Sequence, residues 1–304
     1  MTAAQDLLPH SGVLPFLIDK GPRRALMGRF ARVDDVASSI LARHGYPLPV
    51  AELSAEAIAL AACLASTMDY DGVFTLQASG DGPVKTLFAD VTSAGAVRGY
   101  TSFDKNIGIS GAGAPAAIIS LMGTGYLAFT VDQGEQGRYQ GIVPIEAADL
   151  KSVSMRYFSD SEQIDTALLI AARPGPDNGW HASALLLQRI PETGGSGAAD
   201  ASPPDDEDMD LWHTACTLMA TCSRDEMLDP GLAPRDLLFR LFHELDVRVQ
   251  PFRPLRDECR CSPERVERML ATLSDEEKSS LSDDGERIMI SCEFCKKEHV
   301  YHLS

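Results

Sequence analysis

Four cysteines near the C-terminal end have the types and spacing of a metal site. One residue separates Cys259 from Cys261, and two separate Cys292 from Cys295. Residues two apart on an extended strand point to the same side, so Cys259 and Cys261 can face one ion. Four thiolates in a tetrahedron are a common ligand set of structural zinc. We therefore expect these four cysteines to bind one Zn²⁺ per chain.

The same cysteines are also close enough for redox chemistry, because each pair holds two sulfurs that a disulfide could join. An oxidant can convert zinc-bound thiolates to disulfides and expel the metal. Nearby cations favour the reactive thiolate, and four lie close in sequence: Arg256, Arg260, Lys296 and Lys297. Two alternatives stay open: a zinc-ribbon binding module without a redox role, and a thiol-disulfide oxidoreductase that uses Cys292 and Cys295.

Composition narrows the class of partner. The chain has 304 residues and a formal net charge of -17, which would repel a phosphate backbone, so we do not expect nucleic acid as a partner. The longest strongly apolar helical run, 57–68, is shorter than the roughly 18 residues needed to cross a bilayer, so no membrane is expected. The first ten residues lack the basic region of a secretory signal. These observations predict a cytoplasmic protein.

Residues 1–192 are predicted to form an N-terminal α+β domain with a mostly antiparallel sheet. Two alternating runs within 73–92, joined by a Gly/Asp/Pro turn, predict a hairpin. Ser54 is expected to cap an apolar helix buried between other layers. Hairpins interspersed with helices are typical of α+β folds. Further strands are expected at 96–103, 125–134, 138–145, 166–172 and 182–190, and further helices near 34–43, 115–122 and 146–157.

The composition changes at about residue 193. Residues 194–210 combine glycine and serine with six acidic residues and no basic one, which predicts a solvated acidic loop. Helical spacing follows at 211–228 and 234–245. Such short helices need a surface to dock on, and the second carries an apolar stripe for it: Leu237, Leu238, Leu241, Phe242 and Leu245. We assign 193–252 to this loop and a helical linker.

The last segment, 253–304, is expected to be a small zinc-binding domain. Ser262 is a good helix N-cap, and Ser274 with Glu277 fits a capping box. Two strand-like runs follow, with His299 and His302 expected on the surface of the second. About fifty residues with so few core side chains would be marginally stable alone. Metal binding and folding of this segment should therefore be one event.

The sequence resembles the 33 kDa chaperonins, the redox-regulated heat-shock holdase family. The spacing of the four cysteines matches that family. Further blocks spread over most of the chain resemble it too: "VFTLQASGDGPVKTLFADVTSAGAVRGY" from Val73, "YQGIVPI" from Tyr139, "YFSDSEQIDT" from Tyr157, "LLLQRIPE" from Leu185, "LFHELDVRV" from Leu241 and "CEFC" from Cys292.

The resemblance implies a chaperone rather than an enzyme. The reduced, zinc-bound form would be inactive. Oxidation would form the disulfides Cys259 to Cys261 and Cys292 to Cys295, release zinc and unfold a metastable linker. The exposed apolar surface would then bind unfolding or oxidatively damaged proteins without ATP and prevent their aggregation. The family also implies a homodimer when oxidised, and ATP-driven foldase chaperones downstream.

The other three cysteines have less specific surroundings. Cys63 lies in the apolar helix and is expected to be a small buried side chain. Cys216 and Cys222 lie in the linker, where oxidation could contribute to switching, although ordinary buried thiols are the simpler interpretation.

Overall fold

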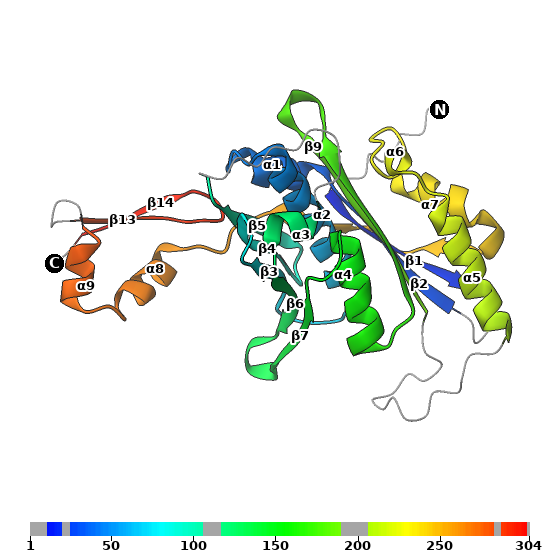
Figure 1. The fold of residues 1–304 in the computed structure, drawn as a ribbon, viewed down its shortest axis with the longest axis horizontal. Coiled ribbons are helices and arrows are strands. Elements are labelled where there is room, and N and C mark those ends of the chain that lie inside the picture. The colour runs from blue at the N-terminus through cyan, green and yellow to red at the C-terminus, as the bar shows by residue number, and fades with distance from the viewer. Residues whose placement is uncertain (1–10, 20–24, 106–116, 190–205, 283–286, 303–304) are drawn as a thin grey trace.

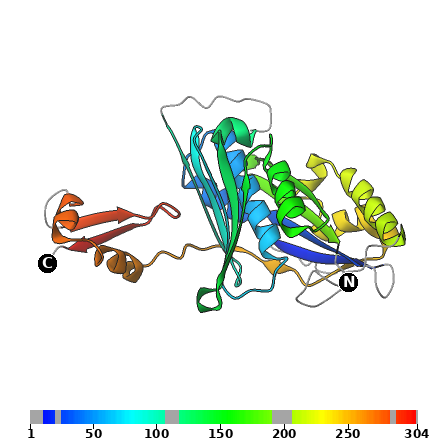
Figure 2. The same cartoon turned by 60° about the horizontal axis from the view of Figure 1, so that its bottom comes forward.

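The computed structural model describes residues 11–19, 25–105, 117–189, 206–282 and 287–302 (Figure 1). Within these ranges the chain forms two six-stranded sheets and one two-stranded sheet. Helices lie between the large sheets and on one outer face (Figures 1 and 2). The predicted α+β class is confirmed.

The first sheet has the strand order β10-β1-β2-β9-β8, with β11 also paired to β1. All its pairings are antiparallel. Two of its strands, β10 and β11, come from the segment that follows the linker helices, so the chain returns to the sheet from which it left. The strands are β1 (Ser11–Asp19), β2 (Ala25–Val33), β8 (Thr166–Pro174), β9 (Trp180–Arg189), β10 (Val247–Val249) and β11 (Arg253–Pro254).

The second sheet has the order β12-β5-β4-β3-β6-β7. Its neighbouring strands β3 and β4 form the hairpin predicted within 73–92. The short β12 pairs in parallel with β5 and leads directly to the first cysteine pair. The strands are β3 (Val73–Gly80), β4 (Val84–Thr92), β5 (Ala96–Phe103), β6 (Gly125–Asp132), β7 (Arg138–Pro144) and β12 (Arg256–Asp257).

A long apolar helix, α2 (Leu48–Ala65), lies between the two sheets and contacts both. It begins after Pro47, so the prediction that Ser54 is its N-cap is wrong. Ser54 is buried inside the helix, and its hydroxyl donates to the Val50 carbonyl at 2.7 Å. Helix α2 is also longer than the predicted apolar run: it has 18 residues, enough to span a membrane, but 78% of it is buried within the protein. The shorter helices α1 (Asp34–Ala42), α3 (Ile118–Met122) and α4 (Leu150–Tyr157) complete this part.

The linker helices α5 (Asp206–Ala220), α6 (Arg224–Met227) and α7 (Pro234–Phe242) cover the outer face of the first sheet (Figures 1 and 2). Their apolar side chains join those of the sheet in a second core, separate from the core around α2. All five residues of the predicted apolar stripe are buried in it. The predicted acidic loop ends earlier than expected, because residues 206–210 form the start of α5; residues 194–205 lie outside the described residues.

The C-terminal segment extends away from the second sheet (Figure 2). It contains α8 (Pro263–Leu270), α9 (Asp275–Ser280) and the antiparallel pair β13 (Arg287–Ser291) and β14 (Glu298–His302). Ser262 caps α8, and Ser274 with Glu277 forms the predicted capping box of α9. His302 is exposed, but His299 is only 6% exposed, which contradicts its predicted surface position.

Candidate metal centre

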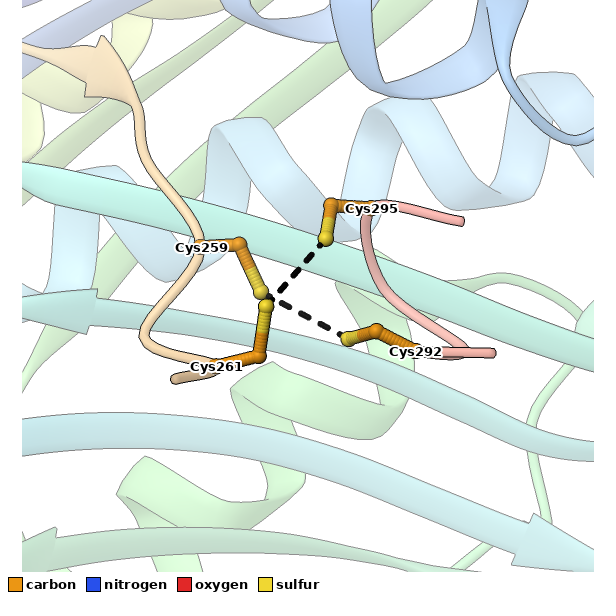
Figure 3. Close-up of side chains that lie close together, drawn as sticks. All are labelled: Cys259, Cys261, Cys292 and Cys295. Carbon is orange, nitrogen blue, oxygen red and sulfur yellow. Dashed lines mark hydrogen bonds between the residues drawn. The ribbon is translucent and has the colours of Figure 1, made fainter. Parts of the chain in front are cut away.

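The four predicted ligands converge at the point where the C-terminal segment meets the rest of the chain (Figure 3). The Sγ atoms of Cys259 and Cys292 are 3.7 Å apart, and those of Cys261 and Cys295 are 3.4 Å apart. All four sulfurs lie within 4.8 Å of one another. A tetrahedron with Zn–S bonds of about 2.3 Å has edges of about 3.8 Å. The donor set therefore fits zinc, in both chemistry and size.

Local backbone geometry presents the second cysteine pair. Strand β13 ends before Cys292, and a turn leads into β14 with Lys296 at φ 58°. The Cys292 N–H donates to the Lys297 carbonyl at 2.9 Å, and the Lys296 N–H donates to the Cys292 carbonyl at 2.8 Å. Burial raises the pKa of the Cys292 thiol, but backbone N–H donors from Cys295 and Phe294, together with hydrogen bonds from the Cys259 and Cys295 thiols, more than offset it, so its pKa lies below the usual value.

The first pair is electrostatically different. Burial raises the pKa of the Cys259 thiol, and the neighbouring Cys292 sulfur adds to the rise. Burial and the other three sulfurs likewise raise the pKa of Cys261. Four thiolates this close repel one another unless a cation lies between them. The cluster thus favours either bound metal or protonated sulfur.

Three of the four cations expected beside the sulfurs bind carboxylates instead. Arg260 binds Asp90 at 2.5 Å. Arg256 pairs with Glu258 at 2.5 Å, and Lys296 pairs with Glu293 at 2.6 Å.

A cation that does act on the cluster is Arg43, which no sequence pattern singled out. Its guanidinium makes two hydrogen bonds to Asp257, of 2.5 and 2.9 Å. These bonds raise the pKa of Arg43, and the charges of Cys295 and Cys259 add to the rise. Arg43 follows α1, more than two hundred residues before the cysteines, so only the folded chain brings it to them.

The remaining cysteines have no part in the cluster. Cys63 is fully buried, and burial raises its pKa to about 12. Burial also raises the pKa values of Cys216 and Cys222 to about 11. The predicted burial of Cys63 is confirmed, and a role of the two linker thiols in switching stays a prediction.

Comparison with known proteins identifies the family. The family model described as "Hsp33 protein" matches residues 12–302, nearly the whole chain. The chain belongs to the Hsp33 family. The 33 kDa chaperonin of Caulobacter vibrioides is 35% identical over 309 residues, covering 98% of both chains. That of Ectopseudomonas mendocina is 35% identical and covers 90% of this chain and 87% of its own.

A solved structure supports the Hsp33 fold. The crystal structure of the 33 kDa chaperonin from Thermotoga maritima matches with a TM-score of 0.76 at 20% identity, covering 96% of this chain and 95% of that one. The resemblance found in the sequence is therefore confirmed. Membership of the Hsp33 family makes this chain a molecular chaperone, and its four clustered cysteines are consistent with the zinc expected there.

Proposed function

We propose that this protein is a redox-regulated, ATP-independent holdase. In its reduced form, Cys259, Cys261, Cys292 and Cys295 hold one zinc ion, and the protein is inactive. Oxidation joins Cys259 to Cys261 and Cys292 to Cys295, zinc leaves, and the linker unfolds to expose an apolar surface that binds unfolding proteins. The observation that carries this proposal is the four-sulfur cluster in a segment with almost no core of its own.

The small core makes the metal necessary for the fold of the C-terminal segment. Among its described residues, the buried apolar side chains are Leu270 and Ile288. Two such side chains contribute on the order of 5 kcal/mol, far less than the entropy of ordering about forty residues. Zinc bound to four thiolates supplies folding free energy directly. Loss of the ion should therefore unfold the segment.

The linker covers the surface that would bind clients. Phe242 is fully buried and stacks on Phe16 of β1, with ring centroids 5.7 Å apart. If the linker leaves, a contiguous apolar sheet face is exposed, which is the kind of surface that captures other unfolded chains. That face consists of Leu14, Phe16, Ile18, Leu26, Phe30, Ala171, Leu185 and Leu187.

One contact supports a metastable linker. Arg32 on β2 is only 6% exposed, and its guanidinium donates to the Leu232 carbonyl at 2.9 Å and to the Met227 carbonyl at 3.4 Å. Burial lowers the pKa of Arg32, and the nearby Asp34 charge only partly opposes this. Burying a cation against neutral carbonyls costs solvation free energy. That cost is recovered when the linker opens and water reaches Arg32.

We also propose the domain boundaries, the location and the partners of the protein. Residues 1–192 form the core domain, 193–252 the acidic loop and metastable linker, and 253–304 the redox-switch domain. The protein works in the cytoplasm, binds unfolding or oxidatively damaged proteins, forms a homodimer when oxidised and passes clients to ATP-driven foldase chaperones. Nucleic acid and membranes are not partners.

The geometry favours this function over the two alternatives. Cys292 and Cys295 lie in a turn between two strands, without the strand-to-helix setting of a thioredoxin-like redox site. A zinc ribbon without a redox role does not account for the second core, in which the linker helices cover an apolar sheet face.

Zinc release and chaperone activity, measured side by side, test the proposal. Peroxide with mild heat should release about one zinc ion per chain to a chromogenic chelator. The oxidised protein should then suppress light scattering by a thermally unfolding client, whereas the reduced, zinc-loaded protein should not. Scattering that stays unchanged after zinc loss would refute the holdase. Full activity with zinc retained would favour the ribbon, and turnover of a dithiol substrate would favour the oxidoreductase.

A further inference from the structure

The residues between the paired cysteines contact the core domain. Arg260, the single residue between Cys259 and Cys261, donates to Asp90 at 2.5 Å. Phe294, between Cys292 and Cys295, lies against β4 and β5, and its carbonyl oxygen is 3.2 Å from Nε2 of His44. Each half of the metal centre therefore holds one side chain against the second sheet.

Phe294 lies in an arrangement of two rings and a cation. Its ring is edge-on to Phe88, with centroids 5.3 Å apart, and to Tyr100, at 6.0 Å. The guanidinium carbon of Arg98 lies 4.0 Å from its centroid. Phe88 and Tyr100 are directly opposed on neighbouring strands. We call Phe88, Arg98 and Tyr100 the aromatic cradle.

Within the aromatic cradle, Arg98 is held in place by its own sheet rather than by Phe294. Arg98 makes hydrogen bonds of 3.1, 3.0 and 2.9 Å to the Asp90 carboxylate, whose side chain is 1% exposed. Asp90 and Arg98 are themselves directly opposed on β4 and β5. The cradle should therefore keep its shape when Phe294 leaves. A fixed cation over a ring position selects an aromatic side chain over an aliphatic one of equal size.

Two large apolar side chains on the same sheet face as the cradle are exposed to solvent. Following the register from Tyr100 through Phe88, the same face continues across the sheet to Ile142 on β7, which is 55% exposed. Tyr126 on β6, on the same face, is 43% exposed. An extended chain crossing this face meets apolar side chains beyond the cradle.

We propose that the aromatic cradle is a recognition site for an aromatic side chain of an unfolded polypeptide, and that Phe294 occupies it while the metal loop is docked. The phenyl ring of Phe294 in the cradle shows that the site fits an aromatic side chain. This inference rests on the proposed holdase function, because it places a client contact on the second sheet, away from the face that the linker covers. Loss of zinc frees the two spacer residues, Arg260 and Phe294, which lie between the paired cysteines. Release of Phe294 opens the cradle.

The test uses the full-length, reduced, zinc-loaded protein. Phe294→Ser opens the cradle and leaves all four cysteines in place, as a zinc assay would confirm. The probes are two fluorescein-labelled Gly/Ser peptides that differ at one position: one carries phenylalanine and the other cyclohexylalanine, which has the same shape without the π-system. Met289→Ser, at a residue 60% exposed on β13, is the matched surface control.

Fluorescence anisotropy should show that the Phe294→Ser variant binds the phenylalanine peptide about five- to tenfold more tightly than the cyclohexylalanine peptide. Wild type and Met289→Ser should bind neither peptide at the same concentrations. Adding Tyr100→Leu should reduce the preference. If Phe294→Ser loses its zinc, the same comparison between peptides is made on oxidised wild type and oxidised Tyr100→Leu.

Equal binding of the two peptides to the open cradle, or no gain over wild type, would overturn the inference while leaving the holdase proposal intact. A phenylalanine preference in the zinc-loaded variant would support the cradle even if oxidation failed to produce chaperone activity. The two failures are therefore distinguishable.

Discussion

Truncating Phe242 should open the linker without disturbing the metal. The ring is fully buried between α7 and the first sheet and stacks on Phe16 at 5.7 Å. Replacing a buried phenylalanine by alanine costs about 3–5 kcal/mol, which would raise the open population of the linker by more than about a hundredfold. Hydrogen exchange of the zinc-loaded, reduced Phe242→Ala variant should show faster exchange over residues 206–245, with zinc content and protection of β3 to β5 unchanged.

The same helix supplies the control. Phe239 lies three residues earlier and is 63% exposed, so Phe239→Ala should change stability by less than about 0.5 kcal/mol. Under the proposed function, Phe242→Ala should also suppress client aggregation without oxidant. Equal exchange of 206–245 in the two variants would refute the reasoning. So would equal loss of protection in both large sheets of Phe242→Ala, because the linker would then not be a separable unit.

Two further predictions concern the core contact of the metal loop and the remaining thiols. Asp90→Asn removes the buried carboxylate that two arginines share and should cost about 3 kcal/mol; calorimetry should show a Tm lower by several degrees, and an unchanged Tm would contradict this role. In the native protein at pH 8, iodoacetamide should modify Cys216 and Cys222, with pKa values of about 11, slowly, and Cys63, at about 12, more slowly still. Below a pKa the thiolate fraction rises about tenfold per pH unit, so mass spectrometry should find about tenfold faster labelling of Cys216 at pH 9; rates independent of pH would contradict these values.

Local sequence patterns predicted local structure well. The one helix start that they misplaced, at Ser54, has a physical explanation. The hairpin within 73–92 follows from alternating side chains and a turn, and the structure contains it. Ser54 failed as a helix start because Pro47 precedes an apolar first turn that also suits a helix. In a helix buried on nearly every face, a serine satisfies its hydroxyl against the preceding turn, as Ser54 does.

The candidate site was predictable in its ligands and not in its surroundings. Spacing alone identified the four cysteines, because structural zinc is commonly bound by two closely spaced ligand pairs. The partners of the spacer residues depend on the tertiary fold: Asp90 lies 170 residues before Arg260. A sequence shows that cations flank the cysteines, but it cannot tell whether they face sulfur or carboxylate. In the structure, carboxylates pair with Arg256, Arg260 and Lys296.

The return of the chain to its own sheet has a consequence for reversibility. The chain leaves the first sheet at the end of β9, Arg189, and rejoins it at β10 and β11, so helices α5 to α7 lie between strands of the sheet that they cover. While β10 and β11 stay paired with β1, the released helices form a closed loop rather than a free arm. Its return is unimolecular, and the entropy of closing such a loop grows only slowly with its length. A bound client thus competes with a tethered occupant at an effective concentration of the order of millimolar, which favours release once reducing conditions return.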